Sequence, residues 1–144
     1  MSLLRDYAAS IAQPTLPLTG NGVRFDWLTF DEEYGKASEF GRCLVASPLT
    51  VAIMVGMSVT DVSQKAIANL GWREIRLTHP VFAGDTLYAE SEVLEARESK
   101  SRPEAGLVTV RTTGRNQNGV VVCTFERTIL VSKRGHSVED RIGY

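Results

Sequence analysis

Few side chains in this sequence could exchange protons with a substrate, and two carboxylates are the first candidates. Asp26 and Asp31 lie on either side of Thr29, and either carboxylate could hold a water molecule or accept a proton. A carboxylate before a helix is more often a cap or a solvated group, so both interpretations stay open. The sequence has only two histidines, His79 and His136, and they are far apart.

Ser47 marks a second place where chemistry is possible, because it precedes Pro48 and a long apolar run. Serine is a favoured helix N-cap, and proline is well tolerated at the first helical position. The N–H groups at a helix N-terminus can stabilise an oxyanion. Pro48 removes one of these donors, which leaves Ser47 as the position of interest, although capping alone explains its presence.

The remaining reactive side chains have simpler interpretations. His79 lies in a turn far along the sequence from Ser47, which favours a surface or turn residue over a base. Arg111 and Arg115 alternate on one predicted strand and could contact the phosphates of a carrier, but a solvated strand face is favoured. Cys43 and Cys123 have no adjacent histidine and no Cys-x-x-Cys spacing, so we expect buried fillers and no metal site.

A helix over Ser47–Val59 is the best determined of the elements that must position these residues. Almost every position from Leu49 onward is apolar, and a helix that is apolar on all sides must be surrounded by protein. Gly56 costs about 1 kcal/mol relative to alanine, which suggests that another backbone passes close by. Replacing Ile53 with Asp is therefore expected to unfold the protein, since a buried unpaired charge is very unfavourable.

Strands follow this helix and predict an α+β domain. Apolar and polar residues alternate in the last strand, and Asn118-Gly119 before it is a strong hairpin signal. One buried helix followed by an antiparallel meander predicts a sheet curled around the helix. The predicted strands are Ala66–Leu77, Thr86–Arg97, Leu107–Asn116 and Val120–Ser132, with a polar loop from Glu98 to Ala105.

The ends of the chain carry weaker signals. Asp31 is expected to cap a short helix that Gly41 ends after Phe40. Residues 1–23 are predicted to be an irregular leader, rich in turn formers toward its end. Residues 135–144 are polar and are expected to form a flexible tail. The chain of 144 residues, 1–144, is long enough for one domain with its own core.

Composition excludes several classes of function. The formal net charge is -1, with 43% hydrophobic and 23% charged residues, which gives no sign of nucleic-acid binding or of attraction to an anionic membrane. The longest apolar run is shorter than the about 20 residues that span a bilayer. Two isolated cysteines and a start without the features of a secretory signal favour a reducing, cytoplasmic location.

The stretch Pro-Val-Phe-Ala-Gly-Asp-Thr-Leu-Tyr-Ala at residues 80–89, followed by further strands, resembles the downstream half of a hot-dog domain of the MaoC-like dehydratase family. The resemblance covers about Phe30 to Val131. It implies an acyl thioester substrate carried on coenzyme A or phosphopantetheine and no bound cofactor. It also implies a homodimer or a hot-dog heterodimer, with an acyl tunnel between two protomers and an edge strand to cover.

The same resemblance shows what this chain lacks. MaoC-like members carry a segment Asp-x-Asn-Pro-Leu-His upstream of a Phe-Gly pair, and its Asp and His hold a water or accept the α-proton. Counting back from Phe40-Gly41 without a gap places Arg24 at the Asp position and Thr29 at the His position. A shift of two residues would instead place Asp26 at the carboxylate position. Neither register supplies an imidazole.

A further family feature lies at the start of the buried helix, where many members have Ala-His-Gly and polarise the thioester carbonyl with backbone N–H groups. This chain has Val45-Ala46-Ser47-Pro48 there. The resemblance thus implies catalytic positions at Arg24, Asp26, Thr29 and Asp31, and substrate contacts at Tyr34, Phe40, Gly41, Ala46 and Ser47.

Three functions are compatible with this sequence. The first is a MaoC-like lyase, an enoyl-CoA hydratase or 3-hydroxyacyl-thioester dehydratase with an atypical site. The second is a non-catalytic hot-dog subunit that binds the thioester or partners a catalytic chain, and the third is a repurposed enzyme such as a thioesterase or one in secondary metabolism. Without the Asp and His, the chain alone is expected to hydrate enoyl-CoA far more slowly, because acid–base catalysis contributes about 10²–10⁴-fold.

Overall fold

The computed structural model describes residues 29 and 31–143. The predicted leader, residues 1–23, therefore lies outside the described residues. In chain order the described elements are α3 (Glu32–Ala37), α4 (Ser47–Met57), a π-helical turn η1 (Val59–Ser63), β1 (Ala66–Leu77), β2 (Leu87–Glu98), β3 (Ala105–Asn116), β4 (Val121–Ser132) and α5 (Val138–Ile142).

The four described strands form one antiparallel sheet in the order β1-β4-β3-β2. β2, β3 and β4 follow one another as hairpins, whereas β1 pairs with β4 on the far side. Gly119 in the β3–β4 turn has a φ of 75°, a left-handed conformation that glycine adopts without strain. The predicted α+β class, the four strands and the hairpin at Asn118-Gly119 are confirmed.

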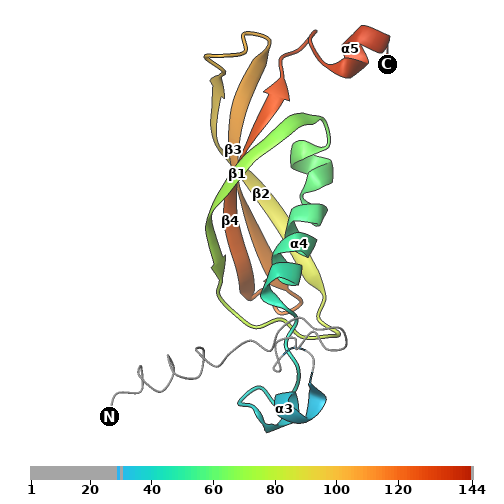
Figure 1. The fold of residues 1–144 in the computed structure, drawn as a ribbon, viewed down its shortest axis with the longest axis vertical. Coiled ribbons are helices and arrows are strands. Elements are labelled where there is room, and N and C mark those ends of the chain that lie inside the picture. The colour runs from blue at the N-terminus through green and yellow to red at the C-terminus, as the bar shows by residue number, and fades with distance from the viewer. Residues whose placement is uncertain (1–28, 30, 144) are drawn as a thin grey trace, which may run out of the picture.

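Helix α4 lies along one face of the curled sheet and packs on it through a small apolar core (Figure 1). Met54 is fully buried on the sheet side of α4. It packs in a cluster with Val81 and with Val122, Cys123 and Phe125 of β4. The alternation of apolar residues along β4 therefore directs one face of that strand toward α4, as the period of two predicts.

The close approach between α4 and a neighbouring backbone occurs at β3 of the sheet. No atom of the described residues outside the helix lies within 4 Å of a Cβ built on Gly56, so the prediction of a backbone passing that residue is wrong for the described part of the chain. A Cβ on Gly114 of β3 would lie 3.1 Å from Met54 Cγ and even nearer to its sulfur. The lack of a side chain at Gly114 is thus what allows Met54 to sit against the sheet.

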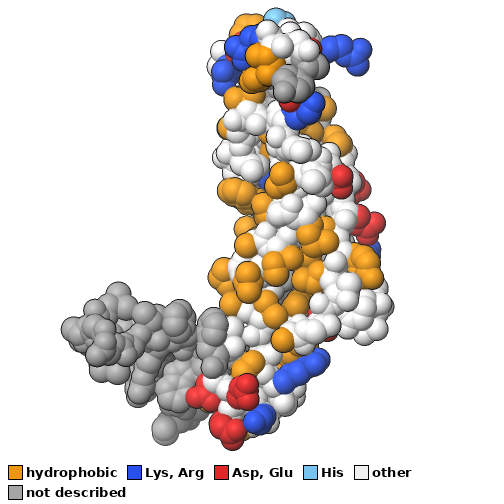
Figure 2. All heavy atoms as spheres, turned by 90° about the vertical axis from the view of Figure 1, so that its right-hand side faces the viewer, with side chains coloured by type: hydrophobic (Ala, Val, Ile, Leu, Met, Phe, Trp, Pro, Cys, Tyr) orange, Lys and Arg blue, Asp and Glu red, His pale blue; other side chains and the backbone are white. Residues whose placement is uncertain are grey.

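One side of α4 is not covered by the described part of the chain. Leu49, Ile53 and Met57 are spaced one turn apart and are 52%, 38% and 40% exposed. We call these three residues the α4 stripe. Figure 2 shows apolar side chains over this side of the molecule. The prediction that protein surrounds the helix is wrong for the described chain, because this side of the helix is exposed. An exposed apolar face of this kind is typical of a contact with another protein surface.

This exposure changes the expectation for Ile53→Asp. A carboxylate at a side chain that is 38% exposed can reach water, so it does not meet the cost of an unpaired buried charge. The premise of the predicted unfolding, a fully buried Ile53, is therefore not met in the described chain.

The short helix α3 begins where the sequence predicts and ends earlier. Asp31 is its N-cap, and its Oδ1 accepts a hydrogen bond from Tyr34 N at 3.0 Å. The helix ends at Ala37 rather than after Phe40, because Ser38 takes an extended conformation and donates through its hydroxyl to the Gly35 carbonyl. Gly41, with a φ of 66°, belongs to the turn that follows.

Half of the predicted flexible tail, residues 135–144, forms the helix α5. Ser137 and Asp140 form a reciprocal capping box at its start, and Gly143 ends it in a left-handed conformation. A salt bridge from Lys65 Nζ to Glu139 Oε1, 3.4 Å long, ties α5 to the beginning of β1. No helix in the described part of the chain is long and apolar enough to cross a bilayer.

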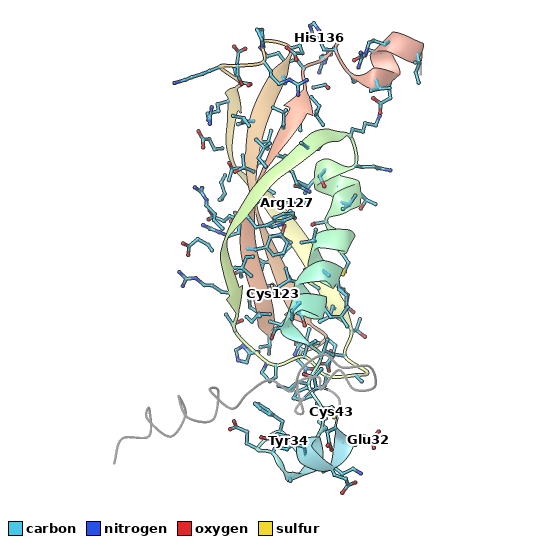
Figure 3. All side chains as sticks on the ribbon, in the orientation of Figure 1. Glu32, Tyr34, Cys43, Cys123, Arg127 and His136 are labelled. Atoms are coloured by element: carbon cyan, nitrogen blue, oxygen red, sulfur yellow. The ribbon has the colours of Figure 1, made fainter. Side chains whose placement is uncertain are left out.

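An arginine lies in the layer between α4 and the sheet (Figure 3). Arg127 of β4 is fully buried, and its Nη2 donates to the carbonyl and the hydroxyl of Ser58 at 3.1 Å each. Its Nε and Nη1 have no hydrogen-bond partner among the described residues. Burial lowers the pKa of Arg127, although an arginine stays protonated over the usual pH range.

Candidate active site

A cavity of about 260 Å³ opens at the start of α4. Its walls come from three parts of the chain: the turn after α3, the first turns of α4 and the segment that follows β1. Phe40, Ser47, Thr50, Thr78, His79 and Val81 contribute to its lining. The cavity thus combines an apolar wall with one imidazole and three hydroxyl groups, two from α4 and one from the segment after β1.

Backbone pairing brings the two sides of this cavity together. Val45 N donates to the Val81 carbonyl at 2.7 Å, and Leu44 forms an isolated antiparallel bridge with Phe82. The ring of Phe82 also contacts Phe40, with centroids 6.2 Å apart. The segment before α4 and the segment after β1 are thereby held side by side, although they are far apart in sequence.

The N-terminus of α4 differs from the predicted cap. Ala46 is the N-cap, without a side-chain capping bond, and Ser47 is the first residue of the helix. The prediction of Ser47 as N-cap and Pro48 as the first helical residue is therefore wrong by one position. The Thr50 N–H already bonds the Ala46 carbonyl, and N–H groups in the first turn have no partner within the helix. Those of Ser47 and Leu49 therefore have no partner within α4, and Ser47 lines the cavity.

His79 has a defined orientation at this cavity. Its Nδ1 lies 2.9 Å from the Val121 carbonyl, which can only accept, so we assign the proton to Nδ1. In the neutral ring Nε2 is then the atom with a free lone pair. The Thr78 hydroxyl donates to the same carbonyl at 2.5 Å. His79 is an exposed residue of the bend after β1, as the sequence predicts, and its ring also lines the cavity that Ser47 lines.

The turn after His79 is closed by a carboxylate. Asp85 Oδ2 accepts a hydrogen bond from Phe82 N at 2.9 Å, and Oδ1 accepts from Gln117 Nε2 at 3.0 Å. Gly84, with a φ of 94°, permits this turn. The Phe82 N–H and the Gln117 amide lower the pKa of the Asp85 carboxyl below its ordinary value of 3.8.

We predict an acid-sensitive contribution of Asp85 to stability. Its pKa is lowered in the folded protein, so its contribution is complete above pH 3.8 and is lost as the pH falls through the folded value. The difference in unfolding free energy between the wild type and Asp85→Asn should shrink below that pH, as measured by denaturation at several pH values. Asp61→Asn, at an exposed residue of η1, is the control. A constant difference would contradict the assignment.

The structure separates the residues predicted to bind or convert substrate. Arg24 and Asp26 lie outside the described residues, and Thr29 is half-buried. Asp31 serves as the cap of α3, which confirms its simpler interpretation. Phe40 and Ser47 line the cavity and Ala46 is the adjacent N-cap, whereas Tyr34, 51% exposed, and Gly41 are not among its lining residues.

The two candidate phosphate-binding arginines are occupied by carboxylates. Arg111 contacts Glu126 at 2.7 Å and Glu92 at 3.3 Å, and Arg115 contacts Glu90 at 2.8 Å. These pairs join neighbouring strands across the sheet face, as the preferred interpretation predicts. Arg111, helped by Arg73, also lowers the pKa of the Glu126 carboxyl.

The two cysteines are free thiols. Cys123 is fully buried in the core, and burial raises the pKa of its thiol, which confirms a filler. Cys43 is only half-buried, and its Sγ lies 3.3 Å from the Asp31 carbonyl. No group of three or more metal-ligating side chains is found among residues 29 and 31–143.

A larger hollow of about 750 Å³ lies at the α5 end of the molecule, where Figure 3 places His136. Its charged residues are largely paired with one another: Lys65 with Glu139, and Arg102 with Glu104 at 3.1 Å. The start of α5, which also lines it, is closed by the reciprocal Ser137–Asp140 capping box. We therefore take the smaller cavity at the start of α4 as the candidate site.

Comparison with known proteins shows the family of the chain. The sequence model of the mesaconyl-CoA hydratase family matches residues 19–142. The chain belongs to this family. A mesaconyl-CoA hydratase of Cereibacter sphaeroides is 39% identical over 107 residues, which are 74% of this chain and 31% of that protein. A β-methylmalyl-CoA dehydratase of Chloroflexus aurantiacus is 36% identical over 78% of this chain and 32% of that protein.

Solved structures show the same fold. A MaoC-like dehydratase from Rhodospirillum rubrum is 34% identical, with a TM-score of 0.64 over 72% of each chain. A Mycobacterium tuberculosis protein with a double hot-dog fold is 25% identical, with a TM-score of 0.68 over 77% of this chain and 36% of that one. The predicted MaoC-like relationship and hot-dog fold are confirmed. The chain spans about a third of the length of the two curated mesaconyl-CoA hydratase-type relatives.

Proposed function

We propose that this chain acts in the reversible hydration of short enoyl-CoA thioesters of dicarboxylic acids, the substrates named for its relatives. The observation that carries the proposal is the cavity at the start of α4, which the first residue of that helix, an apolar wall and an imidazole line together. The acyl group would be carried on coenzyme A. The reaction adds or removes one water and changes no oxidation state.

The cavity suits the first requirement of this reaction. Water adds to the β-carbon only if negative charge can move onto the thioester carbonyl, and fixed N–H donors with a positive dipole end stabilise that charge. Ser47 and Leu49 offer such donors at the first turn of α4. Phe40 and Val81 supply apolar surface for the acyl chain.

The test is direct. Purified chain is mixed with mesaconyl-CoA or with a monocarboxylic enoyl-CoA of similar length, and the enoyl thioester absorbance and the product mass are followed. We expect saturable hydration, slower than that of a member with the Asp and His in place, and stronger with the dicarboxylic substrate. Failure to bind or convert either thioester would contradict the proposal.

A second candidate function is a binding unit that works beside another hot-dog unit. The relatives are about three times as long as the matched segment, and the Mycobacterium tuberculosis protein holds two such units in one chain. The exposed α4 stripe gives this candidate a surface, because three apolar side chains in line favour contact with protein over water. Thioester binding without turnover by the chain alone would favour it.

We predict that Ile53→Asp weakens association of the chain and leaves its fold intact. The residue lies in the middle of the α4 stripe and is partly exposed, so its replacement should lower the unfolding free energy of the isolated chain by about 1–2 kcal/mol, without unfolding it. Light scattering over a range of concentrations should show a lower mass than for the wild type. Val138→Asp, at an exposed residue of α5, is the control. Unchanged mass for Ile53→Asp would remove the stripe as an interface.

A further inference from the structure

We propose that His79 is the proton-transfer residue that this chain itself brings to the cavity, in place of the missing Asp and His. The inference rests on the proposed hydratase function. It starts from the position of the ring, because His79 lines the same cavity as Ser47 and Thr50 at the first turn of α4. Among the described residues that line this cavity, it is the one with a basic side-chain nitrogen that can both accept and return a proton.

The hydrogen bond of the ring fixes which nitrogen does the chemistry. Nδ1 carries the proton and donates to the Val121 carbonyl at 2.9 Å, so Nε2 holds the free lone pair. A histidine held through one nitrogen in this way keeps a single tautomer and orientation. The Thr78 N–H donates to the Val122 carbonyl at 3.0 Å, which anchors the segment that carries the ring to the start of β4.

His136 offers a contrast within the same chain. It lies at the α5 end and lines the larger hollow, away from the start of α4 (Figure 3). His136 precedes α5, whose start is closed by the Ser137–Asp140 capping box, whereas His79 lies beside the start of α4, which has no side-chain capping bond. The two rings therefore form a matched pair for a test, with the same chemistry in different surroundings.

One imidazole suffices for the proton balance of hydration. Nε2 takes a proton from a water as the water oxygen bonds to the β-carbon, and the electrons of the C=C bond move to the thioester carbonyl oxygen. The N–H groups of Ser47 and Leu49 stabilise this enolate. The protonated ring then gives its proton to the α-carbon, the carbonyl re-forms, and the histidine returns to its neutral state.

The decisive variant is His79→Asn in the full chain. The Asn amide can still donate to the Val121 carbonyl, but it has no basic nitrogen in the place of Nε2. We expect kcat for mesaconyl-CoA hydration to fall by about 10²–10⁴-fold. KM and the affinity for a saturated acyl-CoA, measured by calorimetry, should change little, and circular dichroism should show the same fold. His136→Asn, the control, should keep wild-type turnover.

The outcomes separate the two proposals. Wild-type turnover by His79→Asn would overturn the role of His79 and leave the hydratase function standing. A wild-type chain that binds the saturated acyl-CoA but hydrates no enoyl-CoA would also overturn it, and would leave only the binding function. A wild-type chain that binds neither thioester would overturn the proposed function itself, and the role of His79 with it.

Discussion

Phe125→Ala should lower the unfolding free energy by about 3–5 kcal/mol, the usual cost of removing a buried aromatic ring. Phe125 is 1% exposed and packs in the cluster with Met54 of α4, so its loss leaves a cavity between helix and sheet. A domain of this size is stable by only about 5–15 kcal/mol, and the variant would be close to unfolding. Urea denaturation followed by circular dichroism gives the change.

The matched control for Phe125→Ala is Val93→Ala on β2. Val93 is 66% exposed, so removal of its methyl groups should change the unfolding free energy by no more than about 0.5 kcal/mol. A loss of stability at Val93 as large as that at Phe125 would mean that the surface of β2 around Val93 is covered in solution. The core would then be larger than the cluster around Met54.

Arg127→Met should raise the unfolding free energy, by about 1–4 kcal/mol. The guanidinium is fully buried, and two of its nitrogens have no partner among the described residues. Its only described hydrogen bonds go to Ser58. Methionine has a similar length and adapts to irregular space, so it can fill the site without the cost of a buried charge.

The control for Arg127→Met is Arg76→Met on β1, where the side chain is 69% exposed and pairs with Glu74. An exposed pair of this kind contributes at most about 1 kcal/mol. A marked loss of stability in Arg127→Met would contradict the prediction. It would show that the bonds to the end of α4, or a partner outside the described residues, outweigh the cost of burying the charge.

The fold could be predicted because its signals are local. Asn118-Gly119 predicts the β3–β4 hairpin, and Asp31 predicts the start of α3. The alternation of apolar and polar residues along 121–132 predicts which face of β4 packs on α4. The exposure of the α4 stripe could not be predicted in the same way. Apolar residues on every side of a helix are compatible with burial in one chain or between two, and sequence does not distinguish them.

The site was harder to predict for a physical reason. Its walls meet through single long-range contacts, such as Val45 N to the Val81 carbonyl and His79 Nδ1 to the Val121 carbonyl. No residue spacing in the sequence predicts these contacts. Ser47 could be identified from the sequence, because it lies at the predicted start of the buried helix. His79 could not, because its place in the cavity depends on the pairing of β1 with β4.

The strand order also constrains the time course of folding. Strands β2, β3 and β4 are joined by hairpins, so they can pair with little loss of chain entropy, whereas β1 must reach β4 across the whole intervening meander. His79 and Val81 directly follow β1, and their partners are Val121 of β4 and Val45 before α4. The cavity is therefore assembled by the slowest class of contacts in the molecule, and a newly made chain acquires most of its sheet before it acquires its site.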